Sequence, residues 1–380
     1  MFREGTRLRA EHGDDAVADL SLGQPLEPDD SVAAAFRAAA AERFPGRHEY
    51  MPNLGYDDVR SRVAERCGVP GVHAEHVAMT QGAAAAVCVA LRTFVDPGQD
   101  VVGVAPYFPE FRLYAETASA RFVPVPVRDD MSLDLESIAA ALSRNTGAVV
   151  VNSPNNPSGH VLRRDELEGL ATLLRQHNAH TGSRVLLIVD EVYRRLLYPP
   201  HRYASPFESY EHAVLARSFS KDLGIAGERI GYLVIHPSLA SDAVRLGLEL
   251  SMRALGFVNA PATAQRALLH LAGWSVDISL YRSRRDLIVE LARDAGLEFA
   301  DPQGGLYLWM RSPWEDTLAL VDHMVSQRVL VIPGVAFGML SHVRLCFSYP
   351  EPKLAMAVNA LAAARTAVPV AHNREPRPVG

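Results

Sequence analysis

Between residues 76 and 235 the sequence alternates between short apolar runs rich in valine and isoleucine and longer stretches with a helical spacing of apolar residues. This alternation constrains the fold more than any other feature of the chain. Several of the runs are apolar throughout, as is typical of strands covered on both faces. We therefore predict an α/β fold with a mostly parallel, doubly wound sheet. The expected strands are 76–80, 100–105, 121–127, 147–153, 184–192, 213–218 and 230–235.

Helical spacing fills the segments between these strands and much of the chain on either side. Ser31 is a candidate N-cap for an alanine-rich helix that ends before Pro45, and the residues before it look irregular. Residues 297–348 have the pattern of short strands around one helix. The other expected helices are 56–66, 82–95, 109–118, 132–143, 163–178, 260–272, 275–295, 315–327 and 352–365.

Length and composition indicate an ordinary globular protein of two domains, since 380 residues are too many for one small core. The net charge of −6 gives no reason to expect a nucleic-acid partner. The charged start argues against a signal peptide, and no apolar run approaches the roughly 18 residues of a membrane helix. The widely spaced Cys67, Cys88 and Cys346 favour reduced thiols and a cytoplasmic location. No histidine pair has further ligands nearby, so we expect no metal site.

Lys221 is one of two lysines in a chain whose lysines and arginines number 38. A desolvated lysine amine can lose its proton and attack a carbonyl, whereas arginine stays protonated. The hydroxyls of Ser218 and Ser220, together with Arg229, could hold a phosphate beside that amine. A surface lysine in a turn rich in serine and glycine is the ordinary alternative.

Other polar and aromatic residues follow the expected strands, where ligands of doubly wound sheets bind. The segment 80–84 is rich in small residues and opens a helix, whose N-terminus favours an anion. Phe108 could stack on a planar ring, and Asn156 stands in a proline-rich turn as a rigid hydrogen-bond donor. Asp190 follows a buried apolar run and therefore needs a cationic partner, with Tyr193 in the same region.

The segments Asn156–Gly159, Asp190–Tyr193, Ser218–Lys221 and Arg229–Gly231, in this order and spacing, resemble fold type I pyridoxal-phosphate (PLP) enzymes. More closely, they resemble class I/II aminotransferases of the aspartate aminotransferase superfamily. The resemblance extends from Gly23 to Arg344. It implies a large PLP-binding domain with a mostly parallel seven-stranded sheet and a smaller α+β domain. The expected large domain is 46–282, the small domain combines 1–45 with 283–370, and 371–380 form a mobile tail.

The resemblance also implies roles for individual residues around the cofactor. Lys221 resembles the lysine that forms the internal aldimine and moves the proton between Cα and C4′. Asp190 resembles the partner of the pyridine nitrogen, and Asn156 and Tyr193 resemble the donors to the ring 3′-oxygen. Phe108 resembles the aromatic residue that stacks on the ring. The residues that resemble phosphate ligands are Ser218, Ser220, Arg229 and the backbone of Gly82, Ala83 and Ala84; many relatives carry a hydroxyl residue in that last stretch.

Further matches concern substrate and assembly. Arg344 resembles the arginine that binds the substrate α-carboxylate, and Gly23 and Asn156 resemble residues beside that carboxylate. Tyr50 resembles the tyrosine that reaches the phosphate of the neighbouring subunit, which implies a homodimer with shared active sites. Arg253 lies near the place where some relatives hold a second substrate carboxylate, although its spacing is imperfect.

We therefore predict a PLP-dependent aminotransferase that moves an amino group between an amino acid and a 2-oxo acid by a ping-pong mechanism. A PLP-dependent lyase, cyclase or oxidase on the same scaffold is the first alternative, because such enzymes need the same lysine, aspartate and arginine. A non-catalytic sensor protein is the second. Such regulators carry a DNA-binding module, for which this chain has no room before Gly23.

Overall fold

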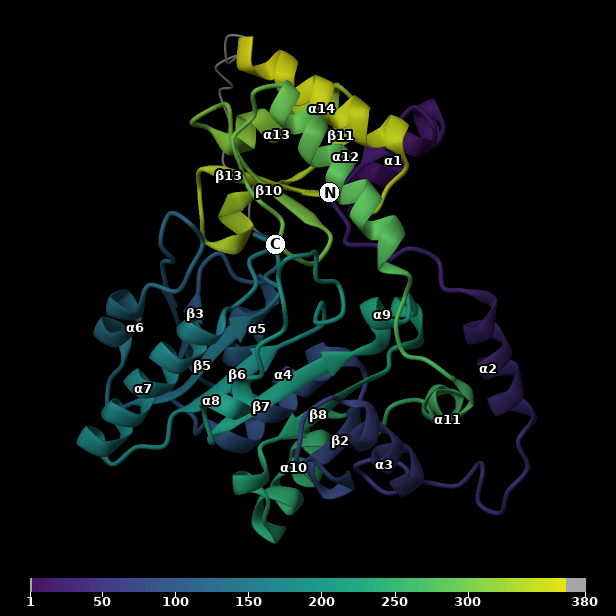
Figure 1. The fold of residues 1–380 in the computed structure, drawn as a ribbon, viewed down its shortest axis with the longest axis vertical. Helices are drawn as coiled ribbons and strands as arrows, with labels where there is room; N and C mark the ends of the chain where they lie inside the picture. Colours follow the sequence, from purple (N-terminus) through teal and green to yellow (C-terminus); the bar gives the residue numbers. More distant parts are fainter. Residues whose placement is uncertain (1, 367–380) are drawn as a thin grey trace.

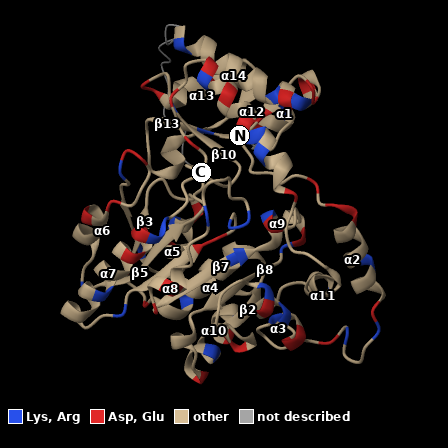
Figure 2. Cartoon of the chain, viewed as in Figure 1, with Lys and Arg blue, Asp and Glu red and all other residues tan. Residues whose placement is uncertain are grey.

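The computed structural model describes residues 2–366, so the tail predicted at 371–380 lies outside the described chain. Figure 1 shows a large part built around one long sheet and a smaller part that lies over one end of it. Acidic and basic residues are interspersed on the helices of both parts (Figure 2). Among residues 2–366, no helix combines the length and apolar character needed to span a bilayer.

The large sheet has seven strands in the order β2-β8-β7-β6-β5-β3-β4, which confirms the predicted sheet. β8 runs antiparallel to both of its neighbours, and the pairs among the strands from β7 to β4 are parallel. The strands are β2 (Val77–Thr80), β3 (Asp100–Val104), β4 (Arg121–Val125), β5 (Thr146–Asn152), β6 (Leu186–Asp190), β7 (Ala213–Ser218) and β8 (Gly231–Ile235).

Helices cover both faces of this sheet because successive strand residues are apolar on alternating sides. Leu187 and Val189 of β6 pack into one core cluster, and Leu186 and Ile188 pack into the other. The first face is covered by α3 (Asp57–Arg66), α7 (Arg164–Thr181) and α11 (Ala262–His270). The second is covered by α4 (Gly82–Phe94), α5 (Glu110–Thr117) and α10 (Asp242–Leu255). Short helices are α6 (Leu135–Ala141), α8 (Pro206–Ser209) and α9 (Phe219–Asp222).

The smaller part is a four-stranded antiparallel sheet in the order β12-β13-β10-β9, packed against three helices. Its strands are β9 (Phe299–Ala300), β10 (Tyr307–Arg311), β12 (Ile332–Pro333) and β13 (His342–Cys346). Its helices are α12 (Ile278–Asp294), α13 (Thr317–Ser326) and α14 (Glu351–Thr366). A separate parallel pair joins β1 (Ala18–Asp19) to β11 (Val329–Leu330) and so brings the N-terminal segment to this part.

The N-terminal region differs from the sequence prediction in two ways. The segment expected to be irregular contains α1 (Phe2–His12). The helix α2 (Asp30–Ala41) is capped by Asp29, whose side chain accepts a hydrogen bond from the Ser31 backbone, so the predicted N-cap at Ser31 is wrong. Both residues are good caps, and sequence alone cannot choose between them. The predicted domain boundaries remain a proposal; α2 packs against α11 and contributes to the core of the large part.

A buried ion pair fixes the ends of the two central strands. Arg217 of β7 and Glu191, which follows β6, lie 2.7 Å apart, and each side chain is 1% exposed. Arg217 also donates to the carbonyl of Cys67 at the end of α3 and to the Tyr203 hydroxyl, which itself donates to Glu191. These contacts hold in register the strand ends that carry Asp190 and Ser218.

We expect Arg217→Ala to lower the free energy of unfolding by about 3–5 kcal/mol, because the change leaves the Glu191 charge buried without its partner. The matched control is Arg112→Ala, which removes an exposed ion pair with Glu116 and should cost less than about 1 kcal/mol. Urea unfolding of both variants measures the difference. Equal losses would contradict a special role for the buried pair.

Candidate active site

A cavity of about 440 Å³ lies beyond the carboxyl ends of β5, β6 and β7, where β10 and β13 of the smaller part approach the large sheet. This is the edge at which doubly wound sheets bind ligands. Residues from both parts form its wall. The predicted site residues that line it are Gly23, Ala83, Ala84, Phe108, Asn156, Asp190, Tyr193, Ser218, Ser220, Lys221, Arg229 and Arg344.

Lys221 stands on α9, a four-residue helix that begins directly after β7 and is capped by Ser218. Its amine donates a hydrogen bond of 2.5 Å to the carbonyl of Gly23. Burial lowers the pKa of the amine to about 8, and the charges of Arg344 and Arg229 act in the same direction. With a pKa of about 8, roughly a tenth of the Lys221 amine is neutral and nucleophilic at pH 7, far more than for an ordinary lysine.

Asp190 is the last residue of β6, and its carboxylate accepts a hydrogen bond from the Val192 backbone. The pKa of this carboxyl group is raised to about 7, chiefly by burial, with the hydrogen bond from Val192 opposing the shift and the Glu191 charge adding to it. No cationic side chain in the described part of the chain is paired with it. A ligand with a positive charge at this end of the cavity would satisfy the carboxylate.

Hydroxyl, guanidinium and backbone groups gather at another end of the cavity. Ser218 Oγ donates to Ser220 Oγ at 2.7 Å and also accepts from the Ser220 backbone. Arg229 has a left-handed backbone with φ of 49°, and its guanidinium bonds the carbonyl groups of Ala226 and Gln81. The N-terminus of α4 lies beside it. This combination favours an anion such as a phosphate.

The close approach of α4 to Arg229 depends on glycine at its first residue. A Cβ atom at Gly82, where φ is 83°, would lie 2.8 Å from an Arg229 nitrogen. The next residues, Ala83 and Ala84, line the cavity with no side-chain donor. Any contact of this turn with an anion would therefore be made by backbone N–H groups.

Arg344 of β13 connects the two parts at the cavity. Its guanidinium donates to the Asn156 side-chain oxygen at 2.9 Å and to the carbonyl of Ser21 at 2.5 Å. The centre of the guanidinium lies 4.2 Å from the centroid of the Tyr307 ring and 4.9 Å from that of Phe337. Its Nε is buried without a hydrogen-bond partner. A guanidinium that is packed against two aromatic rings and keeps a free donor is suited to bind a carboxylate.

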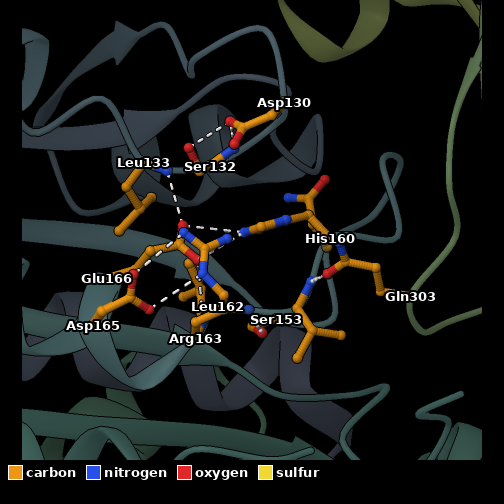
Figure 3. Close-up of polar contacts among 12 residues, drawn as sticks. Asp130, Ser132, Leu133, Ser153, His160, Leu162, Arg163, Asp165, Glu166 and Gln303 are labelled. Carbon is orange, nitrogen blue, oxygen red and sulfur yellow. Dashed lines mark hydrogen bonds and ion pairs between the residues drawn. The ribbon is translucent and has the colours of Figure 1, made fainter. Parts of the chain in front are cut away.

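The loop that carries Asn156 is held by a buried polar network (Figure 3). Glu166 of α7 accepts hydrogen bonds from the backbone of Leu133 and Arg163 and lies 3.1 Å from His160 Nε2. Gln303 accepts from the Val161 backbone at 2.9 Å. Burial acts to raise the pKa of Glu166, but the bonds from His160 and the backbone outweigh it, so the net shift is downward. Asn156 itself is held by its backbone N–H, which donates to the Asn152 side-chain oxygen at 2.6 Å.

Two aromatic groups complete the wall. Tyr193 Oη lies 3.0 Å from Tyr307 Oη, and burial raises the pKa of the Tyr193 phenol well above its ordinary value, so it stays protonated as a donor. Phe108 lies at the start of the segment leading into α5 and packs edge-on against Phe111, with ring centroids 5.6 Å apart. Its position at the cavity allows it to cover one face of a planar ligand.

Three predicted residues, Gly82, Tyr50 and Arg253, are not among those that line this cavity, although Gly82 lies directly beside Arg229. Tyr50 is fully exposed, with a relative accessibility of 104%, and Arg253 is exposed on α10. Tyr50 therefore contributes nothing to the site within one chain, and its predicted role depends on a second subunit. Within residues 2–366 no cluster of three or more histidine, cysteine or acidic side chains could hold a metal ion.

The cavity also contains residues that the sequence did not single out. Tyr307 and Phe337 come from the smaller part, far along the chain, and only the fold brings them to Arg344. Glu110 lines the cavity from the start of α5. The sequence could have indicated Glu110, because it is an acidic residue two positions after Phe108 in the segment that follows β3.

Comparison with known proteins agrees with this site. The family described as aminotransferase class I and II matches residues 15–361. A probable aspartate aminotransferase of Methanocaldococcus jannaschii is 27% identical over 341 residues, which are 87% of this chain and 88% of that protein. An arginine–pyruvate transaminase of Pseudomonas aeruginosa is 31% identical over 352 residues, 89% of this chain and 86% of that protein. The crystal structure of an amino transferase from Eubacterium rectale has a TM-score of 0.90 at 27% identity and covers 95% of this chain and 93% of that one.

The chain belongs to the aminotransferase class I and II family. It is a PLP-dependent aminotransferase, a transferase of nitrogenous groups that acts on amino acids and 2-oxo acids. The lyase, cyclase and oxidase alternatives are not favoured, because the relatives named above are aminotransferases or transaminases.

The lowered pKa of Lys221 can be measured directly because the chain has only one other lysine. In a Lys353→Arg background without cofactor, we expect labelling of Lys221 by acetic anhydride to rise with pH as the amine loses its proton. The rate should reach half of its plateau at about pH 8. Peptide mass spectrometry after short pulses measures the rate. A midpoint near the ordinary value of 10.5 would contradict the desolvated environment.

Proposed function

We propose that the residues of this cavity hold PLP in one orientation, with its pyridine nitrogen at Asp190. The observation that supports this most strongly is the buried Asp190 carboxylate, which no cation of residues 2–366 neutralises. A protonated ring nitrogen supplies the missing charge. The N-terminus of α4 together with Ser218, Ser220 and Arg229 then binds the phosphate. Both ends of the cavity thus match the charges of the cofactor.

The remaining contacts orient the ring. Phe108 packs against one ring face, and Asn156 and Tyr193 donate hydrogen bonds to the 3′-oxygen. The side-chain oxygen of Asn156 accepts a hydrogen bond from Arg344. Its amide nitrogen therefore points away from Arg344 and is free to donate to the cofactor. When bound, PLP supplies an electron sink that stabilises negative charge at the substrate Cα.

Lys221 is the anchor of the cofactor and the proton carrier. Its amine is neutral in part near neutral pH, so it can accept the proton of the substrate Cα at Nζ. The carbonyl of Gly23 holds the amine from one side. Gly23 must be glycine here because a Cβ atom at this position would overlap the Tyr307 hydroxyl.

Arg344 binds the substrate α-carboxylate. Its free Nε faces no protein acceptor, and its contacts with Asn156 and Ser21 fix the plane of the guanidinium. This places the α-carbon of an amino acid between Arg344 and Lys221. The names of the relatives include both aspartate and arginine transaminases, so family membership leaves the side chain of the donor open.

We expect Arg344→Lys to lower kcat/KM for every amino donor by about 10- to 100-fold, because lysine keeps the charge but loses the fork that binds a carboxylate. The loss should fall mainly on KM. Steady-state kinetics measures it, with Arg311→Lys on β10 as an exposed control. An unchanged KM with all donors would contradict the proposal that Arg344 binds the substrate α-carboxylate.

A screen of amino donors against 2-oxo acids tests the proposed function. Conversion of the cofactor to its amine form, followed by absorbance in the near ultraviolet, reports the first half-reaction for each donor. Lys221→Ala should abolish turnover, whereas Lys353→Arg should retain it, since Lys353 pairs with Asp14 outside the cavity. Full activity of Lys221→Ala would contradict the assignment.

We infer that the protein is a homodimer with shared active sites, works in amino acid biosynthesis and resides in the cytoplasm. The exposed Tyr50 is available to a second subunit, and Leu246 and Leu250 form an exposed apolar strip one turn apart on α10. The three cysteines are free, as in a reducing compartment.

Light scattering should give twice the monomer mass. Tyr50→Phe should then raise the Kd of PLP by about tenfold, because one hydrogen bond to a charged phosphate is lost. The variant should remain a dimer by light scattering. Fluorescence titration of the cofactor measures this Kd. A monomer, or an unchanged Kd in the dimer, would contradict the shared site.

A further inference from the structure

Glu110 is a carboxylate in the cavity that the proposed chemistry does not use. It is the first residue of α5, and it lines the same wall as Phe108 and Arg344. Its Oε2 is buried and has no hydrogen-bond partner. Burial raises the pKa of this group, and its own backbone N–H and the Arg344 charge offset only part of the effect. One oxygen atom of Glu110 therefore lacks a donor.

The position of Glu110 at a helix N-terminus explains this geometry only in part. Acidic residues in the first turn of a helix interact with its dipole, and they do so while exposed to water. Asp57 in the first turn of α3 is of this kind, with a side chain 81% exposed. Glu110 instead points into a ligand cavity, where desolvation disfavours its charge.

Once the cofactor and the substrate α-carboxylate are placed, one charged side chain of the cavity wall is left without a ligand group to pair with. Arg229 and Lys221 face the cofactor, Arg344 faces the α-carboxylate, and Asp190 faces the ring nitrogen. Of the charged residues that line the cavity in the described chain, Glu110 remains. The nearby wall is apolar and aromatic, with Val87, Phe111, Tyr114, Ile332 and Phe337. No lining cation is left for an acidic side chain.

We propose that Glu110 determines substrate specificity by pairing with a cationic group, an ammonium or a guanidinium, at the end of the substrate side chain. The inference rests on the proposed function of the cavity. A cation there would give Oε2 its missing donor and would be desolvated together with it, which makes the pair strong. An acidic side chain would place two carboxylates together without a cation and would be rejected.

The first test compares donors of matched shape with the holoenzyme. Arginine and citrulline differ in the charge of the terminal group, and lysine and norleucine also differ in charge. We expect the wild type to favour at least one cationic donor over its neutral partner by about tenfold or more in kcat/KM. Glu110→Gln should reduce that ratio to about one while the value for the neutral donor changes little. Glu116→Gln, on the exposed side of the same helix, is the control.

A second test measures binding without turnover. The ligands 5-guanidinopentanoate and 5-ureidopentanoate correspond to arginine and citrulline without the α-amine, so neither can react. Calorimetry with the holoenzyme should give a Kd about tenfold lower for the guanidino compound in the wild type and equal values in Glu110→Gln. Glu110→Ala should behave as Glu110→Gln does, which separates loss of charge from a misplaced amide.

The outcomes distinguish this proposal from the function on which it rests. If no donor is converted but the binding preference depends on Glu110, the proposed transamination at this site fails and the specificity role stands. If donors are converted and Glu110→Gln weakens cationic and neutral donors equally, Glu110 only balances the charge of Arg344, and the proposal is overturned. It is also overturned if neither cationic donor nor the guanidino ligand is preferred by the wild type.

Discussion

The site depends on one buried charge. Asp190 ends a strand that is covered on both faces, so its carboxylate is desolvated, and burial raises its pKa to about 7. The position is unfavourable for an isolated carboxylate, and a cationic ring nitrogen removes the penalty. The protein also fixes the strand on which Asp190 lies, since the adjacent Glu191 is bound by Arg217 of the next strand. The Arg217–Glu191 ion pair and the unpaired Asp190 carboxylate are therefore neighbours with different roles. The ion pair stabilises the sheet, and Asp190 is available to bind a cationic ligand.

The second constraint is that the substrate end of the cavity is built by both parts of the chain. Arg344 of the smaller part donates to Asn156 of the large one, and Lys221 donates to Gly23 of the N-terminal segment. Binding of a substrate carboxylate at Arg344 therefore acts on the groups that hold the two parts together. The same arrangement keeps cofactor contacts on the rigid sheet and places substrate contacts where the parts meet, so specificity can change without disturbing the cofactor.

Much of the fold could be predicted because the strands are short apolar runs covered on both faces. Asp190 could be found because it is a polar residue at the end of such a run. Lys221 could be found because it is one of only two lysines in the chain and lies three residues after the end of β7. The structure was needed for features that depend on contacts between distant segments. Tyr307 reaches Arg344 through the antiparallel pairing of β10 with β13, which no local pattern reveals. The helix α1 was missed because its sequence is highly charged, with arginine and glutamate pairs such as Arg7 and Glu11 on its surface.

The most direct test of the account is to identify the residue to which the cofactor is bound. The purified protein is treated with PLP, reduced with borohydride and digested, and the labelled peptide is sequenced by mass spectrometry. The account predicts one pyridoxyl group, on the peptide that contains Lys221, and strong loss of labelling in Asp190→Ala. Labelling at Lys353, or labelling of Lys221 that is unaffected by Asp190→Ala, would contradict it.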